Sequence, residues 1–364
     1  MVINSDITGD FYIQWHITNK CNLRCKHCYQ DDYTSHDELS FEDFKLVADK
    51  IFKTLHAWNK LGDFSITGGE PFLHPCIFDI LDYINSSDNV NRLDILTNGM
   101  FITKEIIQKL KQFNKLRYVQ ISLDGSSPEI HDEIRGAGSF NKAMKGIRLL
   151  VENNVEVRLM FTLQRLNMFD IPGIIDLAIQ ESISGITIER IVPPGIDEPG
   201  LSEYFTPTTI YNIFKYISDR ADDEYEKGTQ LKILKYRPLW INLDPCRAKI
   251  GANTPVHKDL GGLCSIGLDG ICVLPNGDVL ACRRLPIVIG NLIRDSLEKI
   301  WTQSKLLWEI RDKNNLKGKC HSCEYSSRCG GCRSMAYAYS GNYLNEDPHC
   351  WKDLNIINTN TYLC

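Results

Sequence analysis

The stretch FYIQWHITNKCNLRCKHC covers residues 11–28 and carries the two features on which our interpretation of the fold depends. Its first part, from Tyr12 to Thr18, is rich in β-branched and aromatic residues, which is typical of a buried strand. Its second part places Cys21, Cys25 and Cys28 in a C-x3-C-x2-C pattern directly after that strand. We therefore expect a strand that ends in a cysteine-bearing loop.

Six runs of strand-like composition occur between Phe11 and Pro194, and longer segments with helical spacing separate them. One such segment follows Ser40, whose hydroxyl can cap the first helical turn. This alternation is typical of parallel strands joined by right-handed helical crossovers. Six units are too few for a closed eight-stranded barrel, so we expect an α/β fold with a partial (β/α)6 TIM-like barrel. The expected strands are Tyr12 to Thr18, Asp63 to Thr67, Arg92 to Thr97, Tyr118 to Leu123, Glu156 to Thr162 and Gly185 to Val192.

The strand and helix alternation ends at Val192-Pro193-Pro194-Gly195, and two further regions follow. We expect residues 1–195 to form the barrel. Residues 196–245 are expected to form a bridging helical segment, with a helix that ends near Arg220 and an acidic run at 222–224 that separates it from the next region. Residues 246–364 contain ten of the fourteen cysteines, and we expect them to form a small cysteine-rich α+β domain.

Charge and hydropathy exclude several classes of function. The chain has 41 Lys and Arg against 46 Asp and Glu, a net charge of −5, so no positive field would concentrate nucleic acid or anionic lipid. The N-terminus lacks the features of a signal peptide, and no run of about 18 uncharged apolar residues occurs. We expect a cytoplasmic protein without nucleic-acid or membrane partners, in which clustered cysteines more often bind metal than form disulfides.

The three N-terminal cysteines have the spacing of an iron–sulfur site. Thiolates at this separation can bind three irons of one cubane cluster and leave the fourth iron without a protein ligand. That open iron can bind a small molecule. The alternative is a zinc site, but zinc needs a fourth ligand for closure, and His27 or His36 would have to supply it.

Together with three further motifs, this loop resembles the radical S-adenosylmethionine (SAM) superfamily, whose C-x3-C-x-aromatic-C loop follows the first strand of a partial barrel. His27 occupies the aromatic position, where the family stacks a ring near adenine. The other motifs end the second, third and fourth expected strands, where parallel α/β folds bind ligands. They are Thr67-Gly68-Gly69-Glu70-Pro71, Thr97-Asn98-Gly99 and Ser122-Leu123-Asp124-Gly125.

The resemblance implies a SAM site built from these motifs. Gly68 and Gly69 would let the backbone approach a ligand, and Glu70 or a nearby carbonyl would bind the methionine ammonium. Ser122 and Asp124 share one face of their strand and resemble a ribose-binding pair. The other cofactor-binding candidates are Asn98 after the third strand, Arg135 for the SAM carboxylate, Gln164 after the fifth strand and Arg190 on the sixth.

In this family the open iron chelates SAM, and the reduced cluster passes an electron to the sulfonium. The products are methionine and a 5′-deoxyadenosyl radical, which abstracts hydrogen from an unactivated carbon. The resemblance thus implies SAM and a [4Fe–4S] cluster bound by Cys21, Cys25 and Cys28. The cofactor carries out this chemistry, while the protein orients the reactants and excludes competing quenchers.

The C-terminal cysteines resemble the SPASM extension of radical SAM enzymes that modify peptides, which implies two auxiliary [4Fe–4S] clusters. Pro275-Asn276-Gly277-Asp278 predicts a hairpin turn that would return Cys264 and Cys282 to the same end of a hairpin. Zinc ribbons are the alternative source of C-x2-C pairs. By resemblance, auxiliary cluster I is bound by Cys264, Cys282 and Cys332. Auxiliary cluster II is bound by Cys320, Cys323, Cys329 and Cys350.

This chain departs from the family pattern in one place. The family usually has three residues between the last two cysteines of the quartet, whereas only Gly330 and Gly331 separate Cys329 from Cys332 here. The placement of Cys332 is therefore open. The fourth ligand of cluster I is also open among Cys246, Cys272 and no protein ligand.

These resemblances predict an enzyme that abstracts hydrogen from a ribosomally made peptide or protein and oxidises, crosslinks or epimerises it. Epimerisation needs a thiol that returns a hydrogen atom, and Cys246 and Cys272 are the catalytic candidates for that role. Sulfatase-type maturation is disfavoured because Arg283 and Arg284 follow Cys282, where those relatives have an acidic residue. The alternatives are side-chain chemistry on a tetrapyrrole, as in haem-pathway relatives, and a non-catalytic iron–sulfur or zinc protein.

The radical chemistry also predicts protein partners. An external electron donor such as ferredoxin or flavodoxin would reduce the first cluster. Only twenty residues precede Cys21, too few for a fused leader-peptide recognition domain. We therefore expect leader binding to fall to a separate protein or to the barrel itself.

Overall fold

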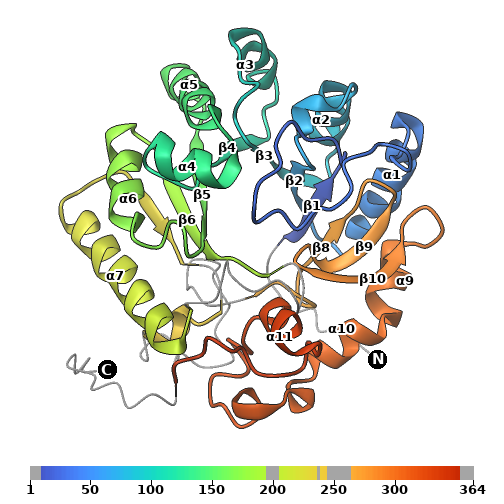
Figure 1. The fold of residues 1–364 in the computed structure, drawn as a ribbon. Coiled ribbons are helices and arrows are strands. Elements are labelled where there is room, and N and C mark those ends of the chain that lie inside the picture. The colour runs from blue at the N-terminus through green and yellow to red at the C-terminus, as the bar shows by residue number, and fades with distance from the viewer. Residues whose placement is uncertain (1–9, 194–204, 236–237, 244–263, 353–364) are drawn as a thin grey trace.

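The computed structural model describes residues 10–193, 205–235, 238–243 and 264–352. Within them, ten strands form one sheet in the order β10-β9-β8-β1-β2-β3-β4-β5-β6-β7. Strands β1 to β7 are parallel, and the intervening helices lie on the outer side of a curved, open arc (Figure 1). The predicted α/β partial barrel is confirmed.

All six expected strands are present, and their ends lie within two residues of the prediction. They are β1 (Phe11–His16), β2 (Gly62–Thr67), β3 (Val90–Thr97), β4 (Leu116–Ser122), β5 (Val157–Leu163) and β6 (Gly185–Arg190). The helices of the barrel are α1 (Phe41–Ala57), α2 (Ile77–Ser86), α3 (Lys104–Leu110), α4 (Pro128–Arg135), α5 (Ser139–Glu152) and α6 (Ile171–Gln180).

Helix α1 illustrates how local sequence fixes these elements. The Ser40 hydroxyl accepts a hydrogen bond from the Asp43 backbone N–H at 3.1 Å and caps the helix. Phe44, Val47 and Ile51 recur at helical spacing and are buried in the core. Each such side chain contributes about 1.5–3 kcal/mol of hydrophobic stabilisation. Strands β2 and β6 are buried at every position, as strands covered on both faces should be.

The bridging segment differs from the prediction in two respects. Its helix α7 (Pro207–Glu226) does not end near Arg220, and the acidic run at 222–224 belongs to its last turns. Glu224 is buried there because Arg220 and Lys227 both donate to its carboxylate, so these charges continue the helix instead of ending it. A short strand that the sequence pattern did not indicate, β7 (Lys232–Leu234), then adds a seventh parallel strand beside β6.

The predicted hairpin of the cysteine-rich region is present, and it joins the sheet of the barrel. Strand β8 (Gly270–Val273) pairs in parallel with β1, and β9 (Asp278–Cys282) and β10 (Leu285–Asn291) continue the sheet in antiparallel pairing. Gly277 adopts a φ of +82° in the turn, a backbone conformation that glycine adopts without strain. The hairpin therefore fixes the cysteine-rich region against the first strand of the barrel.

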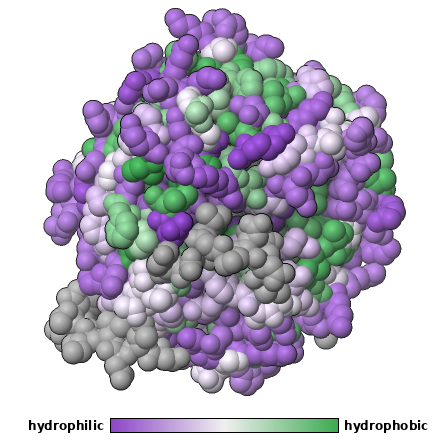
Figure 2. Space-filling view, in the orientation of Figure 1, coloured by the Kyte–Doolittle hydropathy of each residue, from purple (hydrophilic) through white to green (hydrophobic). Residues whose placement is uncertain are grey.

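The remaining elements of the bridging segment and of the cysteine-rich region follow in chain order. They are the single turn η2 (Trp240–Leu243), helices α9 (Leu297–Gln303) and α10 (Lys305–Arg311), the turns η4 (Lys313–Asn315) and η5 (Gly318–Cys320), and α11 (Arg333–Ser340). Helices α10 and α11 lie beside the open side of the arc (Figure 1). The face seen there is largely hydrophilic, with small groups of apolar residues (Figure 2). Among the described residues, no helix has both the length and the apolar character needed to span a bilayer.

Candidate functional site

A cavity of about 320 Å³ lies inside the arc, between the barrel strands and the cysteine-rich region. Its wall extends from the loops after β1 and β2 to the end of the β8–β9 hairpin. Six of the cysteines predicted to bind clusters line this one cavity. They are Cys21, Cys25, Cys28, Cys264, Cys282 and Cys332.

The N-terminal cysteine loop is held by the loop that follows β2. The Gly69 N–H donates to the Thr18 carbonyl at 2.8 Å, and the Glu70 N–H donates to the Lys20 carbonyl at 2.7 Å. A Cβ atom on Gly68 would lie 2.5 Å from the Thr18 carbonyl oxygen, and one on Gly69 would lie 2.4 Å from that of Lys20. The two glycines are therefore needed for contact with the chain's own cysteine loop, besides any approach to a ligand.

Glu70 lies behind the wall of the cavity. Its carboxylate is fully buried and accepts hydrogen bonds from the Thr97 hydroxyl and from the backbone N–H groups of Asn98 and Phe72. Burial raises its pKa to about 7, while these hydrogen bonds oppose the rise. The carboxylate thus ties the loop after β2 to that after β3, and only its neighbouring backbone groups are left for a ligand's ammonium.

Asp124 is also buried, behind the wall that Ser122 lines. Arg135 Nε donates to its carboxylate at 2.5 Å, the Thr162 N–H donates at 2.7 Å, and His27 Nε2 lies 3.6 Å away. Although burial opposes it, the Arg135 and His27 side chains hold the pKa of Asp124 below its usual value. The structure therefore gives Asp124 a positioning geometry, because its carboxylate orients Arg135 and His27, which face the cavity.

Gln164 completes this buried network. Its amide nitrogen lies 3.2 Å from His27 Nδ1, and its Oε1 has no hydrogen-bond partner among the described residues. Arg135 also connects the network to the cysteines, since its Nη1 lies 3.8 Å from Cys25 Sγ. Burial raises the pKa of Cys21 to about 11 and raises that of Cys25, with Arg135 opposing the latter shift. Both thiols therefore stay protonated at neutral pH unless a metal takes the place of the proton.

The other predicted cofactor residues line the cavity with different partners. Asn98 donates to the Asn22 side-chain oxygen at 2.8 Å, inside the cysteine loop. Arg190 forms a two-pronged ion pair with Asp347, at 3.0 and 2.9 Å, across the boundary between β6 and the cysteine-rich region. The sequence pattern did not identify Asp347, because no local motif marks a partner that lies 157 residues away.

A second, smaller cavity lies within the cysteine-rich region. The four cysteines assigned by resemblance to auxiliary cluster II all line it, together with Asn242, Lys319 and Lys352. None of the described residues lining this cavity is acidic. Four thiols and two lysines form a suitable environment for a cluster that carries net negative charge, so the residues present fit the group. The four cysteines are Cys320, Cys323, Cys329 and Cys350.

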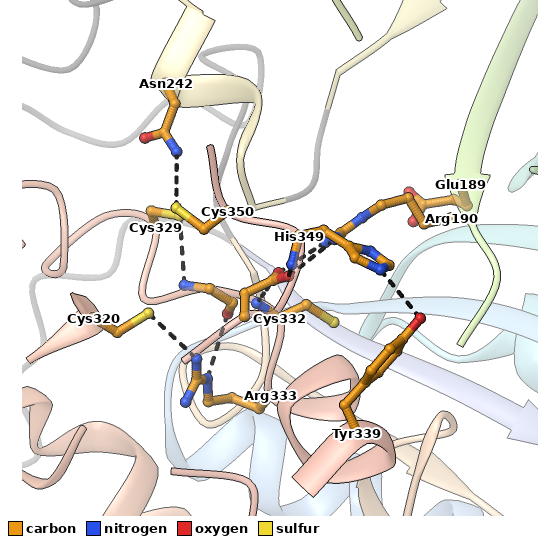
Figure 3. Close-up of polar contacts among 12 residues, drawn as sticks. Glu189, Arg190, Asn242, Cys320, Cys329, Cys332, Arg333, Tyr339, His349 and Cys350 are labelled. Atoms are coloured by element: carbon orange, nitrogen blue, oxygen red, sulfur yellow. Dashed lines mark hydrogen bonds and ion pairs between the residues drawn. The ribbon is translucent and has the colours of Figure 1, made fainter. Parts of the chain in front are cut away.

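The shortened end of the quartet separates two neighbouring cysteines. Gly330 and Gly331 both adopt the left-handed conformation, with φ of +59° and +66°. Cys329 lines the small cavity before this turn, and Cys332 lines the large one after it. The Cys332 N–H donates to Asp347 at 2.9 Å, which fixes the cysteine at the point where Arg190 holds the same carboxylate (Figure 3).

Of the two cysteines predicted to be catalytic, the structure describes only Cys272. Cys246 lies outside the described residues. Cys272 is buried on β8 and lines the large cavity, and burial raises its pKa well above the usual value for a thiol. The cavity wall also contains Arg283 and Tyr29, which the sequence pattern did not assign to a site. The Arg283 guanidinium lies 4.1 Å from the centre of the Tyr29 ring.

Comparison with known proteins agrees with this arrangement. The model of the radical SAM superfamily matches residues 15–178, and that of an iron–sulfur cluster-binding domain, SPASM, matches residues 264–324. An AdoMet-dependent heme synthase of Methanosarcina barkeri is 30% identical, over 93% of this chain and 95% of that protein. The chain belongs to the radical SAM superfamily.

Further relatives of this radical SAM protein act in other pathways. The subtilosin biosynthesis protein AlbA of Bacillus subtilis is 30% identical over 87% of this chain and 65% of its own length. Among solved structures, anSMEcpe with AdoMet and a peptide has the same fold, with a TM-score of 0.75 and 19% identity over 94% of each chain. Streptococcus suis SuiB bound to its precursor peptide SuiA has a TM-score of 0.72 and 16% sequence identity, over 93% of this chain and 75% of that chain.

Membership establishes an enzyme that uses SAM, a [4Fe–4S] cluster and auxiliary iron–sulfur clusters. When bound, the first cluster and SAM supply a strongly oxidising carbon radical. The large cavity has walls with buried hydrogen-bonded side chains, which limit the access of water and other quenchers.

Proposed function

We propose that this protein abstracts hydrogen from a peptide or protein substrate in the large cavity. The observation that carries the radical SAM part is the distribution of the cysteines predicted to bind clusters: six of them line the large cavity and four line the small one. The peptide part is supported by AlbA, by name a bacteriocin biosynthesis protein, and by the fold shared with two proteins whose structures hold peptides.

We assign Cys21, Cys25 and Cys28 to the SAM-binding cluster. The spacing of the thiols disfavours zinc at these positions. Thiolates that bind one zinc ion must converge to about 3.8 Å from one another, whereas those on a cubane lie farther apart. Within the described ranges, no three Cys, His, Asp or Glu side chains converge closely enough to hold a single metal ion. Auxiliary cluster I is assigned to Cys264, Cys282 and Cys332. Auxiliary cluster II is assigned to Cys320, Cys323, Cys329 and Cys350.

The cofactor assignment is tested by anaerobic reconstitution with iron and sulfide, followed by SAM and dithionite. We expect about twelve irons per chain and formation of 5′-deoxyadenosine. A chain that binds zinc and leaves SAM intact would contradict the assignment. External reduction by ferredoxin or flavodoxin should replace dithionite in the same assay.

A second candidate substrate is a tetrapyrrole with carboxylate side chains. The heme synthase relatives favour it, and so does Arg283, which lines the cavity and whose Nε has no hydrogen-bond partner among the described residues. To separate the two, the reconstituted enzyme is given either Fe-coproporphyrin III or a cysteine-containing peptide encoded beside its gene. The true substrate should raise 5′-deoxyadenosine above the substrate-free level and itself lose hydrogen by mass spectrometry.

A further inference from the structure

The small cavity presents a hydrogen-bond donor to each of its four cysteine sulfurs. Arg333 Nη2 lies 3.9 Å from Cys320 Sγ, and the Gly331 N–H lies 3.4 Å from Cys329 Sγ. The other two contacts are Lys352 Nζ to Cys323 Sγ at 3.4 Å and Asn242 Nδ2 to Cys350 Sγ at 3.8 Å. The Arg333 contact with Cys320 and the Asn242 contact with Cys350 are drawn in Figure 3.

Two of these donors are cations, and they differ in burial. The Arg333 side chain is among the largest fully buried ones, with 2% of its surface exposed. The Lys352 side chain is 28% exposed and pairs with Glu324 at the surface. Charges in a buried, low-dielectric position act more strongly on a neighbour than exposed, screened charges. Of these two donors, Arg333 is therefore the cation with the larger effect on its sulfur; it lines the large cavity and contacts Cys320, which lines the small one.

The Arg333 guanidinium donates to backbone carbonyls and has no counterion in the part of the chain that the structure describes. Its Nη1 donates to the carbonyls of Tyr343 and Asn345 at 2.8 and 2.7 Å, and no carboxylate among the described residues pairs with it. The nearby buried carboxylate of Asp347 is already committed to Arg190. A buried guanidinium without a counterion is costly, so an anionic group in the cavity is its natural partner.

We propose that Arg333 is a positioning residue that raises the reduction potential of the cluster in the small cavity. The inference rests on the proposed assignment of that cluster. Reduction adds one electron and no proton, so the reduced cluster is one charge more negative. A fixed buried cation stabilises that form more than the oxidised form, and hydrogen bonds to the sulfurs act in the same direction. The cluster in the small cavity is therefore reduced more easily than the same cluster would be without the cation.

The experiment is an anaerobic redox titration of the reconstituted full-length enzyme, followed by electron paramagnetic resonance and iron analysis. Arg333→Gln removes the charge, Arg333→Lys retains it, and Arg148→Gln changes an exposed barrel arginine as a control. At the wild-type midpoint of one wave, Arg333→Gln should lower the reduced-to-oxidised ratio about tenfold, or about 59 mV for one electron. Arg333→Lys should restore most of the ratio, and Arg148→Gln should leave every wave unchanged.

A titration in which Arg333→Gln retains all its iron and shifts no wave overturns the inference. If Arg333→Gln does not fold, Lys352→Met, which removes the second cationic donor, takes its place. We expect this variant to lower the reduced-to-oxidised ratio of the same wave by less than tenfold, and an unchanged ratio overturns the inference. A wild-type enzyme without three clusters contradicts the proposed function instead. The two failures are thus distinguishable, because the first leaves the iron content intact.

Discussion

Replacement of Asp347 by Asn tests the ion pair that joins the barrel to the cysteine-rich region. The Asp347 side chain is fully buried, and its two oxygens accept from Arg190 and from the backbone N–H groups of Cys332 and His349. Asn preserves the size but leaves the Arg190 charge buried without a counterion. Breaking one partner of a buried pair costs about 3–5 kcal/mol, so we expect a loss of that order in the free energy of unfolding.

The same variant should disturb cluster I. Asn has one acceptor oxygen where Asp has two, so it cannot accept from all of these donors, and the hydrogen bond that fixes the Cys332 N–H is weakened. We expect about four irons fewer per chain, since cluster I is the one assigned to Cys332. The assay is anaerobic urea unfolding of the reconstituted protein, followed by tryptophan fluorescence, with iron measured on the same samples.

The pH dependence gives an independent check. Although burial opposes it, Arg190 holds the pKa of Asp347 well below the usual value. Stabilisation by a carboxylate with a lowered pKa is present above the unfolded pKa of about 3.9, and it is lost only as the pH falls through the folded pKa. The difference between wild type and Asp347→Asn should therefore be constant between about pH 6 and 9.

The exposed Asp312 provides a matched control for this substitution. It caps a short turn by accepting from the Asn314 N–H at 3.0 Å, and Asn can accept that bond equally well. Asp312→Asn should change the free energy of unfolding by no more than about 0.5 kcal/mol. A cost of less than about 1 kcal/mol for Asp347→Asn, with full iron content, would refute the reasoning about the buried pair.

Three further substitutions test the large cavity and the glycine turn. Cys25→Ala should abolish 5′-deoxyadenosine formation and leave about eight irons, whereas Cys76→Ala, which alters a thiol outside both cavities, should change neither. Burial raises the Glu70 pKa from 4.5 to about 7, so the stabilisation by the protonated side chain is lost as the pH rises through that range. Between pH 5.5 and pH 8, urea unfolding should show Glu70→Gln gaining about 2 kcal/mol relative to wild type. Gly331→Ala would place a Cβ 2.7 Å from Arg333 Nη2 at a φ of +66°, and we expect lower thermal stability and less iron, while an unchanged melting temperature would contradict this.

The elements that the sequence predicted best are those determined by local pattern. The strands and the hairpin turn at Gly277 were identified within two residues, because apolar runs and turn residues act over a few positions. The parallel pairing of β8 with β1 was not predicted, since nothing local states which strand a hairpin will join. The extent of α7 was misjudged because Arg220, within the helix, and Lys227, directly after it, both donate to Glu224.

In the candidate site, too, local pattern predicted the positions of residues, whereas tertiary packing determined their contacts. Motif order places these residues at the ends of β1 to β4, but it does not say which way each polar side chain turns. Glu70 and Asp124 follow strands just as Ser122 does, and yet both carboxylates turn into the protein and accept from it. A carboxylate at a strand end can satisfy either a ligand or a neighbouring backbone N–H, and only the three-dimensional packing decides between them.

The Asp347 carboxylate connects residues of the two cavities. Arg190 ends β6 and lines the large cavity, and it fixes Asp347, which in turn holds the Cys332 N–H. Beyond the glycine turn, Arg333 contacts Cys320 in the small cavity. Hydrogen bonds therefore connect the end of β6 to Cys332, and the short glycine turn connects Cys332 to the small cavity. The shortened quartet tolerates the loss of one residue because Gly330 and Gly331 reverse the chain and Asp347 fixes the cysteine that follows.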